Sequence, residues 1–494
     1  MSTDLMLPDH LEGLHIHLVG AKGTGVAALA EILTARGARL SGSDVADIFY
    51  TDAILEALGV AMSVGFDASH IPNDTQFVIH SAAYGRDGNP ELLEAARRCL
   101  PVMNYPEALG SLSRRSDSSG IAGVHGKTTT TAMVGSIISA LNLPATVLAG
   151  SAVSSFGGRS TMIRGDHYFI AETCEYRRHF LSFRPSRIVL TSIESDHQDF
   201  YPTYGDIYAA FLDYLRLLPK GGELIYCADD TGASAAAREI VAERPDIGLI
   251  PYGQTAVGPY RLTSYKTGDG AARFRLSGLE SEFILRVPGR HLALDASAAL
   301  ALAFSILGTE RRACGVVSQV PTAADLAVSR EALALFAGSK RRSEILGEVG
   351  GILFMDDYGH HPTAIRETIR GIKEFWPNRR LVVDFMSHTY SRTKALFADF
   401  VASLDAADVV VMHGIYASAR ESPDPIVSGR KLFDAVGQRR AARPQYYYES
   451  VLEGIEDLAA ILQPGDLFLT MGAGDNWKLG EALLARFRVA GGER

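Results

Sequence analysis

The chain begins with an apolar run, a glycine-rich turn and a second periodic segment. "LHIHLV" at 14–19 predicts a buried strand, "GAKGTG" at 20–25 a turn, and the Ala- and Leu-rich stretch after it a helix. The next apolar segment ends in Ser43 and Asp44. This order predicts a βαβ unit, and a second cycle follows with a strand at 75–83 and a helix that begins at Asn89-Pro90.

The alternation of strands and helices continues beyond residue 120. The polar stretch "SLSRRSDSSG" at 111–120 predicts turns and a domain boundary. Strands around "HYFIAETCEY" and "RIVLTSIESDH" then predict a mainly parallel sheet that is covered on both faces. Short, glycine-punctuated segments at 251–290 predict a small antiparallel appendage, and the apolar helix at 293–308 returns to the α/β pattern.

A third α/β segment begins near "FAGSKRRS" at 336–343. Four strands are predicted there, at "GILFMDDY", "RLVVDFM", "ADVVVMHG" and "DLFLTMGAG", with helices such as "PTAIRETIRGIKEF" between them. A chain of 494 residues is too long for one hydrophobic core. The pattern therefore predicts an α/β fold of three domains, at 1–115, 116–335 and 336–494.

Composition and charge narrow the classes of function. A net charge of −9 argues against broad electrostatic binding of nucleic acid, so anionic ligands must be held by local groups. We expect no membrane partner, because no run of about 18 apolar residues stands out. The polar start "MSTDLMLPDH" does not resemble a secretory signal, so a cytoplasmic protein is expected. The four cysteines lack metal-ligand spacing, and we expect reduced thiols.

The glycine-rich turn at 20–25 is the first candidate ligand site. Gly20, Gly23 and Gly25 precede a helix, whose backbone N–H groups and dipole can hold a diphosphate. The spacing differs from GxGxxG, so an ordinary turn remains an equal alternative. Asp44, about 20 residues further on, can accept a ribose hydroxyl or serve as a turn residue.

The stretch "AGVHGKTTTTAM" at 122–133 is a stronger candidate for phosphate binding. Lys127 offers a charge for β- and γ-phosphates, Gly126 allows close backbone approach, and Thr128 or Thr129 can complete a magnesium shell. Gly123 and Gly126 enclose only two residues, where the usual nucleotide loop has four. A threonine-rich helix start does not explain the glycines and the lysine together.

Further polar residues follow predicted strands. Glu172 and Asp196-His197 lie at strand ends, where they can hold Mg²⁺ or remain ordinary loop residues. "DDYGHHPTAI" at 356–365 and "SHTYSRT" at 387–393 gather carboxylates, imidazoles and an arginine at two more strand ends. Two such clusters favour recognition of a charged small substrate, although a single histidine there could be structural.

Together these motifs resemble the Mur ligase family, from "GAKGTG" to "GAGDNWKLG" at 472–480. The short "GVHGKTTTT" loop is similar to the form that this family carries. "CEYRRHFLSFRP" and "SRT" resemble the Gram-positive version, and "DDYGHHP" resembles the alanine-adding branch and its close relatives. The resemblance implies Rossmann-like first and third domains and a central P-loop ATPase-type domain.

The resemblance also implies roles for single residues. It assigns three residues to catalysis: Lys127, Glu172 and His197. It assigns three to metal binding: Thr128, Glu172 and His197. The residues expected to bind ATP are Gly123, Gly126, Lys127, Thr128, Thr129, His291, Asp295, Arg342 and Asp357. Those expected to bind a UDP-sugar are Gly20, Lys22, Gly23, Thr24, Gly25 and Asp44. Those expected to border the amino acid are Tyr358, His360, His388 and Arg392.

The implied activity is an ATP- and Mg²⁺-dependent ligation in peptidoglycan precursor synthesis. ATP would phosphorylate the lactyl carboxylate of UDP-N-acetylmuramate, and L-alanine would attack the acyl phosphate. Two alternatives stay open: a ligase that recycles a murein tripeptide, and a nucleotide-binding regulatory protein derived from such a ligase. A monomer or homodimer is expected.

One stretch departs from the family pattern. Leu292 and Asp295 stand in "GRHLALDAS" where asparagines are usual, and these asparagines help to read adenine. An amide both donates and accepts hydrogen bonds, whereas leucine does neither and a carboxylate only accepts. The resemblance therefore leaves open how this chain recognises the base.

Overall fold

The computed structural model describes residues 5–85, 88–268, 270–316, 320–417, 421, 423–441 and 443–490. These residues divide into two compact units. The first comprises 1–193, 208–252 and 298–329, and the second 194–207, 253–297 and 330–494, within the described ranges.

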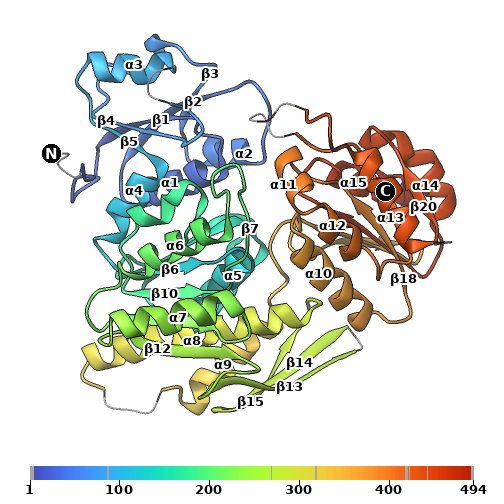
Figure 1. Cartoon of the computed structure of the whole chain (residues 1–494). Coiled ribbons are helices and arrows are strands. Elements are labelled where there is room, and N and C mark those ends of the chain that lie inside the picture. Colours follow the sequence, from blue (N-terminus) through green and yellow to red (C-terminus); the bar gives the residue numbers. More distant parts are fainter. Residues whose placement is uncertain are drawn as a thin grey trace. The chain divides into compact units, whose positions relative to one another are not determined.

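The first unit begins with a five-stranded parallel sheet in the order β3-β2-β1-β4-β5 (Figure 1). Its strands are β1 (His15–Val19), β2 (Arg39–Asp44), β3 (Ala61–Val64), β4 (Phe77–His80) and β5 (Val102–Asn104). Its helices are α1 (Thr24–Ala35), α2 (Thr51–Ala57), α3 (Pro90–Arg97) and α4 (Tyr105–Ser113). Both predicted βαβ cycles are confirmed, and Asn89 caps α3 by accepting from the N–H of Glu91 and of Leu92.

The prediction that 111–120 is turn-rich was wrong. Helix α4 runs through Ser113, and the strand β6 (Asp117–Ala122) begins only four residues later. A capping box between Asn104 and Glu107 starts α4, and the serines near the junction are buried. Ser118 Oγ donates to Ser113 O at 2.7 Å. The hydroxyls of Ser111, Ser113 and Ser118 thus form hydrogen bonds inside the protein, which polarity alone did not predict.

A larger sheet follows in the first unit, in the order β12-β11-β10-β6-β9-β7-β8. All neighbours are parallel except β8, which runs antiparallel to β7. Its other strands are β7 (Ala145–Val153), β8 (Arg159–Ile163), β9 (Tyr168–Glu172), β10 (Arg187–Leu190), β11 (Glu223–Cys227) and β12 (Gly248–Gly253). The helices in this part of the chain are α5 (Lys127–Ala140), α6 (Tyr204–Leu215), α7 (Thr231–Glu243), α8 (Arg290–Ala313) and α9 (Ala323–Ala334). The predicted parallel sheet is confirmed.

Helix α8 corrects the expectation about apolar runs. By length and composition its 24 residues could cross a membrane, but 83% of its most apolar window is buried inside the protein. Residues such as Leu300, Leu302 and Ile306 are fully buried. The apolar side chains of α8 therefore pack in the core of the protein.

The second unit contains the predicted antiparallel appendage. Its strands are β13 (Tyr260–Gly268), β14 (Ala271–Leu276) and β15 (Leu279–Leu285), which pair antiparallel. The predicted span began too early, because residues 251–253 belong to the parallel strand β12.

The rest of the second unit is a six-stranded sheet in the order β16-β17-β21-β18-β19-β20. Only β16 is antiparallel to its neighbour. The strands are β16 (Glu344–Val349), β17 (Ile352–Asp357), β18 (Arg380–Phe385), β19 (Val409–Met412), β20 (Gln445–Tyr447) and β21 (Asp466–Met471). The helices are α10 (Pro362–Phe375), α11 (Tyr390–Ala395), α12 (Phe397–Ser403), α13 (Gly429–Arg440), α14 (Ile455–Ile461) and α15 (Trp477–Ala490).

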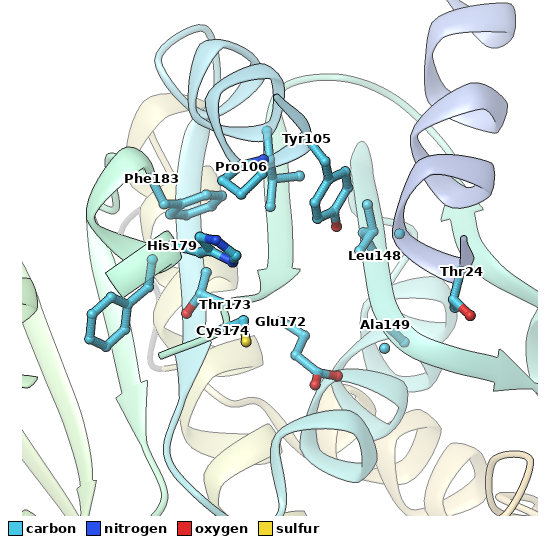
Figure 2. Close-up of a pocket in the computed structure, with 14 residues that line it drawn as sticks. Thr24, Tyr105, Pro106, Leu148, Ala149, Glu172, Thr173, Cys174, His179 and Phe183 are labelled. Atoms are coloured by element: carbon cyan, nitrogen blue, oxygen red, sulfur yellow. The ribbon is translucent and has the colours of Figure 1, made fainter. Parts of the chain in front are cut away.

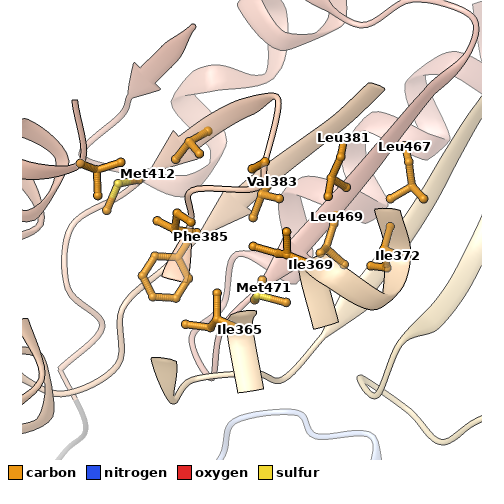
Figure 3. Packing of buried hydrophobic residues seen from close by; sticks show 14 of the residues in the cluster. Ile365, Ile369, Ile372, Leu381, Val383, Phe385, Met412, Leu467, Leu469 and Met471 are labelled. Atoms are coloured by element: carbon orange, nitrogen blue, oxygen red, sulfur yellow. The ribbon is translucent and has the colours of Figure 1, made fainter. Parts of the chain in front are cut away.

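Both faces of this sheet are covered, as the apolar strands predict. Successive side chains of a strand point to opposite faces, so Leu353 and Met355 join one core and Ile352 and Phe354 the other. Figure 3 shows the first core, where Ile365, Ile369 and Ile372 of α10 pack over the sheet. The strand ends, with their polar residues, are thereby fixed by two packed layers.

Candidate active site

The phosphate-binding candidate lies between β6 and α5. Gly123 and Gly126 have φ values of +133° and +79°. A Cβ on Gly123 would lie 2.0 Å from Thr191 Oγ1, so only glycine fits there. The N-cap of α5 is Gly126, which has no side-chain cap. The first N–H groups of the helix can therefore face an anion, as the sequence predicts.

Lys127 is the first residue of α5 and is held inside the protein. Its Nζ donates to Gly123 O and to both carboxylate oxygens of Glu175, at 3.1 and 3.0 Å. Burial disfavours the charged form, but Glu175 and Glu172 outweigh it, so the pKa of Lys127 is raised. Glu175 was not singled out from the sequence. Its position three residues after Glu172, still beside the same strand end, was the available signal.

Thr128 and Glu172 form an oxygen pair next to this lysine. Glu172 ends β9, which pairs with β6 so that Glu172 lies opposite Ile121. Thr128 Oγ1 donates to Glu172 Oε2 at 2.8 Å. Hydroxyl and carboxylate oxygens are the donors that Mg²⁺ prefers, so this pair fits the predicted metal. His197 belongs to the second unit, and its metal-binding role stays a prediction.

An open cavity adjoins this pair within the first unit. Figure 2 shows Tyr105, His179 and Cys174 around it, with the carboxylate of Glu172 on one side. Thr24 and Gly25 from the glycine-rich turn also line it. The cavity thus joins residues predicted for the UDP-sugar to one predicted for the metal. Tyr105 was missed because no motif surrounds it, and His179 was not singled out although it stands within "CEYRRHFLSFRP".

Titratable groups of the cavity are strongly influenced by burial. Burial, followed by the charge of Glu172, raises the pKa of the Tyr105 phenol. Desolvation inside the cavity and the neighbouring Glu175 also raise the pKa of the Cys174 thiol, although the residue keeps contact with solvent. Both groups are therefore neutral at physiological pH, and the cavity carries its negative charge on carboxylates.

The glycine-rich turn is built on the end of β2. The N–H groups of Gly20 and Ala21 donate to Ser43 O, and the N–H of Lys22 donates to Asp44 Oδ2 at 2.7 Å. Lys22 Nζ forms an ion pair with Asp52 at 2.9 Å. Asp44 therefore shapes the turn, which is the alternative that the sequence offered beside a ribose contact.

Tyr105 explains the last glycine of this turn. A Cβ on Gly25 would lie 2.8 Å from the Tyr105 ring. The absent side chain leaves the helix N-terminus of α1 open beside the cavity. Ligand binding by the six predicted residues of this region stays a prediction.

The second unit brings together the four residues predicted for the amino acid. The ring centroids of Tyr358 and His360 lie 5.1 Å apart, and those of His360 and His388 lie 6.1 Å apart. Arg392 Nη1 lies 3.1 Å from His388 Nδ1. The guanidinium also forms a buried ion pair with Asp196, at 2.7 Å. Two separate sequence motifs thus form one cluster around an arginine.

His388 is predicted to stay neutral over the whole physiological range. Burial, followed by the charge of Arg392, lowers its pKa to about 4. We therefore expect the His388 imidazole signal in NMR spectra to titrate near pH 4, and not near 6.5. A His388→Gln variant assigns the signal, and a midpoint above pH 6 would contradict the expectation. Because the pKa is lower in the folded state, the unfolded chain protonates His388 first as pH falls from about 6.5 towards 4. His388 therefore lowers the free energy of unfolding over this range.

Arg342 packs against the ring of Tyr358, and Asp357 precedes Tyr358 in the chain. The Arg342 guanidinium lies 5.1 Å from the Tyr358 ring centroid. Asp357 is buried and accepts from the N–H groups of Ser343 and Gly359, each at 2.7 Å. This carboxylate orders the backbone around it, while Arg342 keeps its charge beside the aromatic ring.

His291 and Asp295 lie one turn apart near the start of α8. Their spacing of four residues puts them on the same face of that helix. Asp295 is 7% exposed and Leu292 is 6% exposed. Their contact with a nucleotide base stays a prediction.

These features define a class of protein. A glycine- and lysine-containing loop at a helix start, a carboxylate–hydroxyl pair beside it and an adjoining cavity are the parts of an α/β nucleotide-dependent enzyme. A second α/β unit with its own polar cluster adds a place for another substrate.

Comparison with known proteins identifies the family. Three family models match in series: "Mur ligase family, catalytic domain" at 15–117, "Mur ligase middle domain" at 121–303 and "Mur ligase, glutamate ligase domain" at 341–474. The chain belongs to the Mur ligase family. The predicted three-domain α/β fold is thereby confirmed, while the exact boundaries stay predictions.

Individual relatives agree over the full length. The chain is 52% identical to a UDP-N-acetylmuramate–L-alanine ligase of Treponema pallidum over 482 residues, 98% of each chain. It is 38% identical to the enzyme of that name in Borreliella burgdorferi, over 95% of this chain and 98% of the relative. The crystal structure of UDP-N-acetylmuramate-alanine ligase from Thermotoga maritima matches with a TM-score of 0.77 and 26% identity, covering 97% of this chain and 100% of that one.

Proposed function

We propose that this protein is an ATP-dependent ligase that joins L-alanine to UDP-N-acetylmuramate in peptidoglycan precursor synthesis. The observation that carries the proposal is the group of Lys127, Thr128 and Glu172 at the edge of the cavity. Relatives that share the chain's full length and bear that activity in their names support it. We expect the enzyme to act in the cytoplasm, as a monomer or homodimer.

The reaction has to activate a carboxylate, which an amine does not attack directly. Transfer of the γ-phosphoryl group of ATP to the lactyl carboxylate gives an acyl phosphate. The amine of L-alanine then attacks the acyl carbon and phosphate leaves. Lys127 and the N–H groups at the start of α5 would stabilise the charge on the transferring phosphoryl oxygens.

Thr128 and Glu172 would hold Mg²⁺, which neutralises phosphate charge when bound. The sugar nucleotide would lie with its diphosphate at the N-terminus of α1 and its lactyl group in the cavity. Neutral His388 and charged Arg392 suit the amine and the carboxylate of a small amino acid, respectively. Most of the rate enhancement then comes from positioning and electrostatics.

Phosphate release by the purified protein tests this proposal. UDP-N-acetylmuramate, ATP and Mg²⁺ are supplied with L-alanine, glycine, L-serine or the murein tripeptide in separate reactions. We expect release to be fastest with L-alanine. Release with the tripeptide alone would instead mark a recycling ligase, and nucleotide binding without release with any amine would mark a regulatory protein.

Asp295 provides a separate test of base recognition. We expect Asp295→Asn to lower the KM for ATP relative to GTP, because an amide can both donate to and accept from adenine. Initial rates with each nucleotide at saturating sugar and L-alanine measure the ratio. Asp325→Asn is a matched control, since Asp325 is buried to the same extent and pairs with Arg311 on the later part of α8. An unchanged ratio in Asp295→Asn would exclude a role in reading the base.

A further inference from the structure

We propose that Glu175 is a positioning residue whose carboxylate pairs with the Lys127 ammonium until a nucleotide binds. When this ion pair breaks, the movement of Glu175 couples the phosphate loop to the cavity. The proposal rests on the proposed function, because it takes the loop at 123–128 to bind ATP. It adds a role for a residue to which the sequence analysis assigned none, although Glu175 stands within "CEYRRHFLSFRP".

The hydrogen bonds of Lys127 are already complete within the protein. A lysine ammonium has three N–H donors. Gly123 O and the two oxygens of Glu175 provide three acceptors, the latter at 3.1 and 3.0 Å. Lys127 and Glu175 are 13% and 2% exposed at their side chains, so water contributes little. A phosphate oxygen can bind Lys127 only if one of these partners gives way.

Glu175 is the partner that is expected to leave. Gly123 O is main chain, and its residue is fixed by a backbone conformation that only glycine fits. Glu175 is a side chain, and its carboxylate would repel an incoming phosphate next to the same ammonium. Breaking a buried ion pair costs free energy, so Glu175 lowers the affinity of Lys127 for every anion. A nucleotide can offset this cost with its other contacts, whereas inorganic phosphate has few.

Movement of Glu175 away from Lys127 would alter the lining of the cavity. Glu175 lies between Cys174 and the kinked 3₁₀ segment η3 (Tyr176–Ser182). Glu175 O accepts from the N–H of Arg178 at 2.8 Å, and Cys174 O accepts from the N–H of Phe180 at 2.9 Å. Cys174, His179 and Phe180 line the cavity. A shift of Glu175 therefore changes the surface on which the second substrate is expected to rest.

Binding of ADP with Mg²⁺ to the full chain, measured by calorimetry, tests the first part. Glu175→Gln keeps the shape of the side chain and removes its charge, so we expect about tenfold tighter binding of ADP. Glu175→Asp, which keeps the charge, is expected to stay close to the wild type and serves as the second variant. Glu223→Gln is the matched control, because Glu223 pairs with Arg187 at 3.3 Å elsewhere in the first unit.

The outcomes separate this inference from the proposed function. A wild-type protein that does not bind ADP would contradict the assignment of the loop itself. If the wild type binds ADP but folded Glu175→Gln binds it equally or more weakly, only the role of Glu175 is overturned. Inorganic phosphate gives a further measure, since its inhibition of ligation should strengthen in Glu175→Gln and not in Glu223→Gln.

Alkylation of Cys174 tests the coupling to the cavity. Iodoacetamide labelling is followed by peptide mass spectrometry, with exposed Cys314 as the internal reference. We expect ADP to change the labelling rate of Cys174 in the wild type, and to change it much less in Glu175→Gln. Direct shielding by ADP would persist in the variant, so an equal effect of ADP in both proteins would overturn the coupling.

Discussion

Replacing Lys127 by alanine is expected to lower the rate of ligation by about 10²- to 10³-fold. The substitution removes the positive charge beside the transferring phosphoryl group, and the loss of one such group in a preorganised site costs about 10² to 10³ in kcat. ADP formation at saturating sugar and L-alanine measures the effect. Near-normal turnover of a folded Lys127→Ala protein would contradict the assignment of the loop.

The ion pair with Glu175 requires a second variant. Lys127→Ala leaves a buried carboxylate without its partner, and breaking a buried pair from one side destabilises by about 3–5 kcal/mol. We therefore expect Lys127→Ala/Glu175→Gln to recover much of the lost stability in thermal unfolding while remaining inactive. This separates a missing phosphate ligand from a damaged fold. A double variant that regains activity would show that Lys127 is dispensable.

Several of the strands that were predicted from sequence are buried on both faces, although β7 and β11, which lie inside their sheet, were missed. β17, β18 and β21 read as continuous apolar runs because helices cover each side of their sheet. β8, β16 and β20 were missed, and each is partly exposed at the edge of a sheet. An edge strand has mixed polarity and a short length, so periodicity gives it little signal.

The residues of the candidate site likewise divide into those that local sequence patterns indicate and those that only the structure reveals. Lys127 was identified from the glycine-containing loop before a helix, and Glu172 and Asp196 were identified from their places after predicted strands. Glu175 and Asp196 acquire their partners only through the fold, from residues 48 and 196 positions away in the sequence. Such pairs depend on the packing of separate elements, which local patterns do not encode. Sequence therefore located the chemistry, and the structure added the groups that hold it in place.

Removal of Arg392 is the second change with a large expected effect. Burial alone would raise the pKa of Asp196, but Arg392, with His197 and His360, holds that pKa well below its usual range. Arg392 and Asp196 are 6% and 4% exposed at their side chains. We expect Arg392→Ala to destabilise the protein by about 3–5 kcal/mol, because a buried charge loses its partner. Arg439→Ala, which breaks the exposed pair with Asp405, should cost less than about 1 kcal/mol.

The pH dependence of this loss distinguishes an unpaired charge from simple loss of packing. In the wild type the pKa of Asp196 is lower in the folded state than in the unfolded state. Asp196 therefore stabilises the fold at every pH above its unfolded pKa of about 3.9, and this stabilisation is lost only in stronger acid. In Arg392→Ala the effect of burial dominates, so the pKa of Asp196 in the folded variant rises. The unpaired carboxylate then destabilises the variant at neutral pH, and this destabilisation decreases as Asp196 takes up a proton. The stability gap between wild type and variant should therefore narrow between pH 7.5 and pH 5, as measured by urea unfolding. A gap that is the same at both pH values would mean that Arg392 acts through its packing, and Asp196→Asn/Arg392→Ala would then fail to restore stability at pH 7.5.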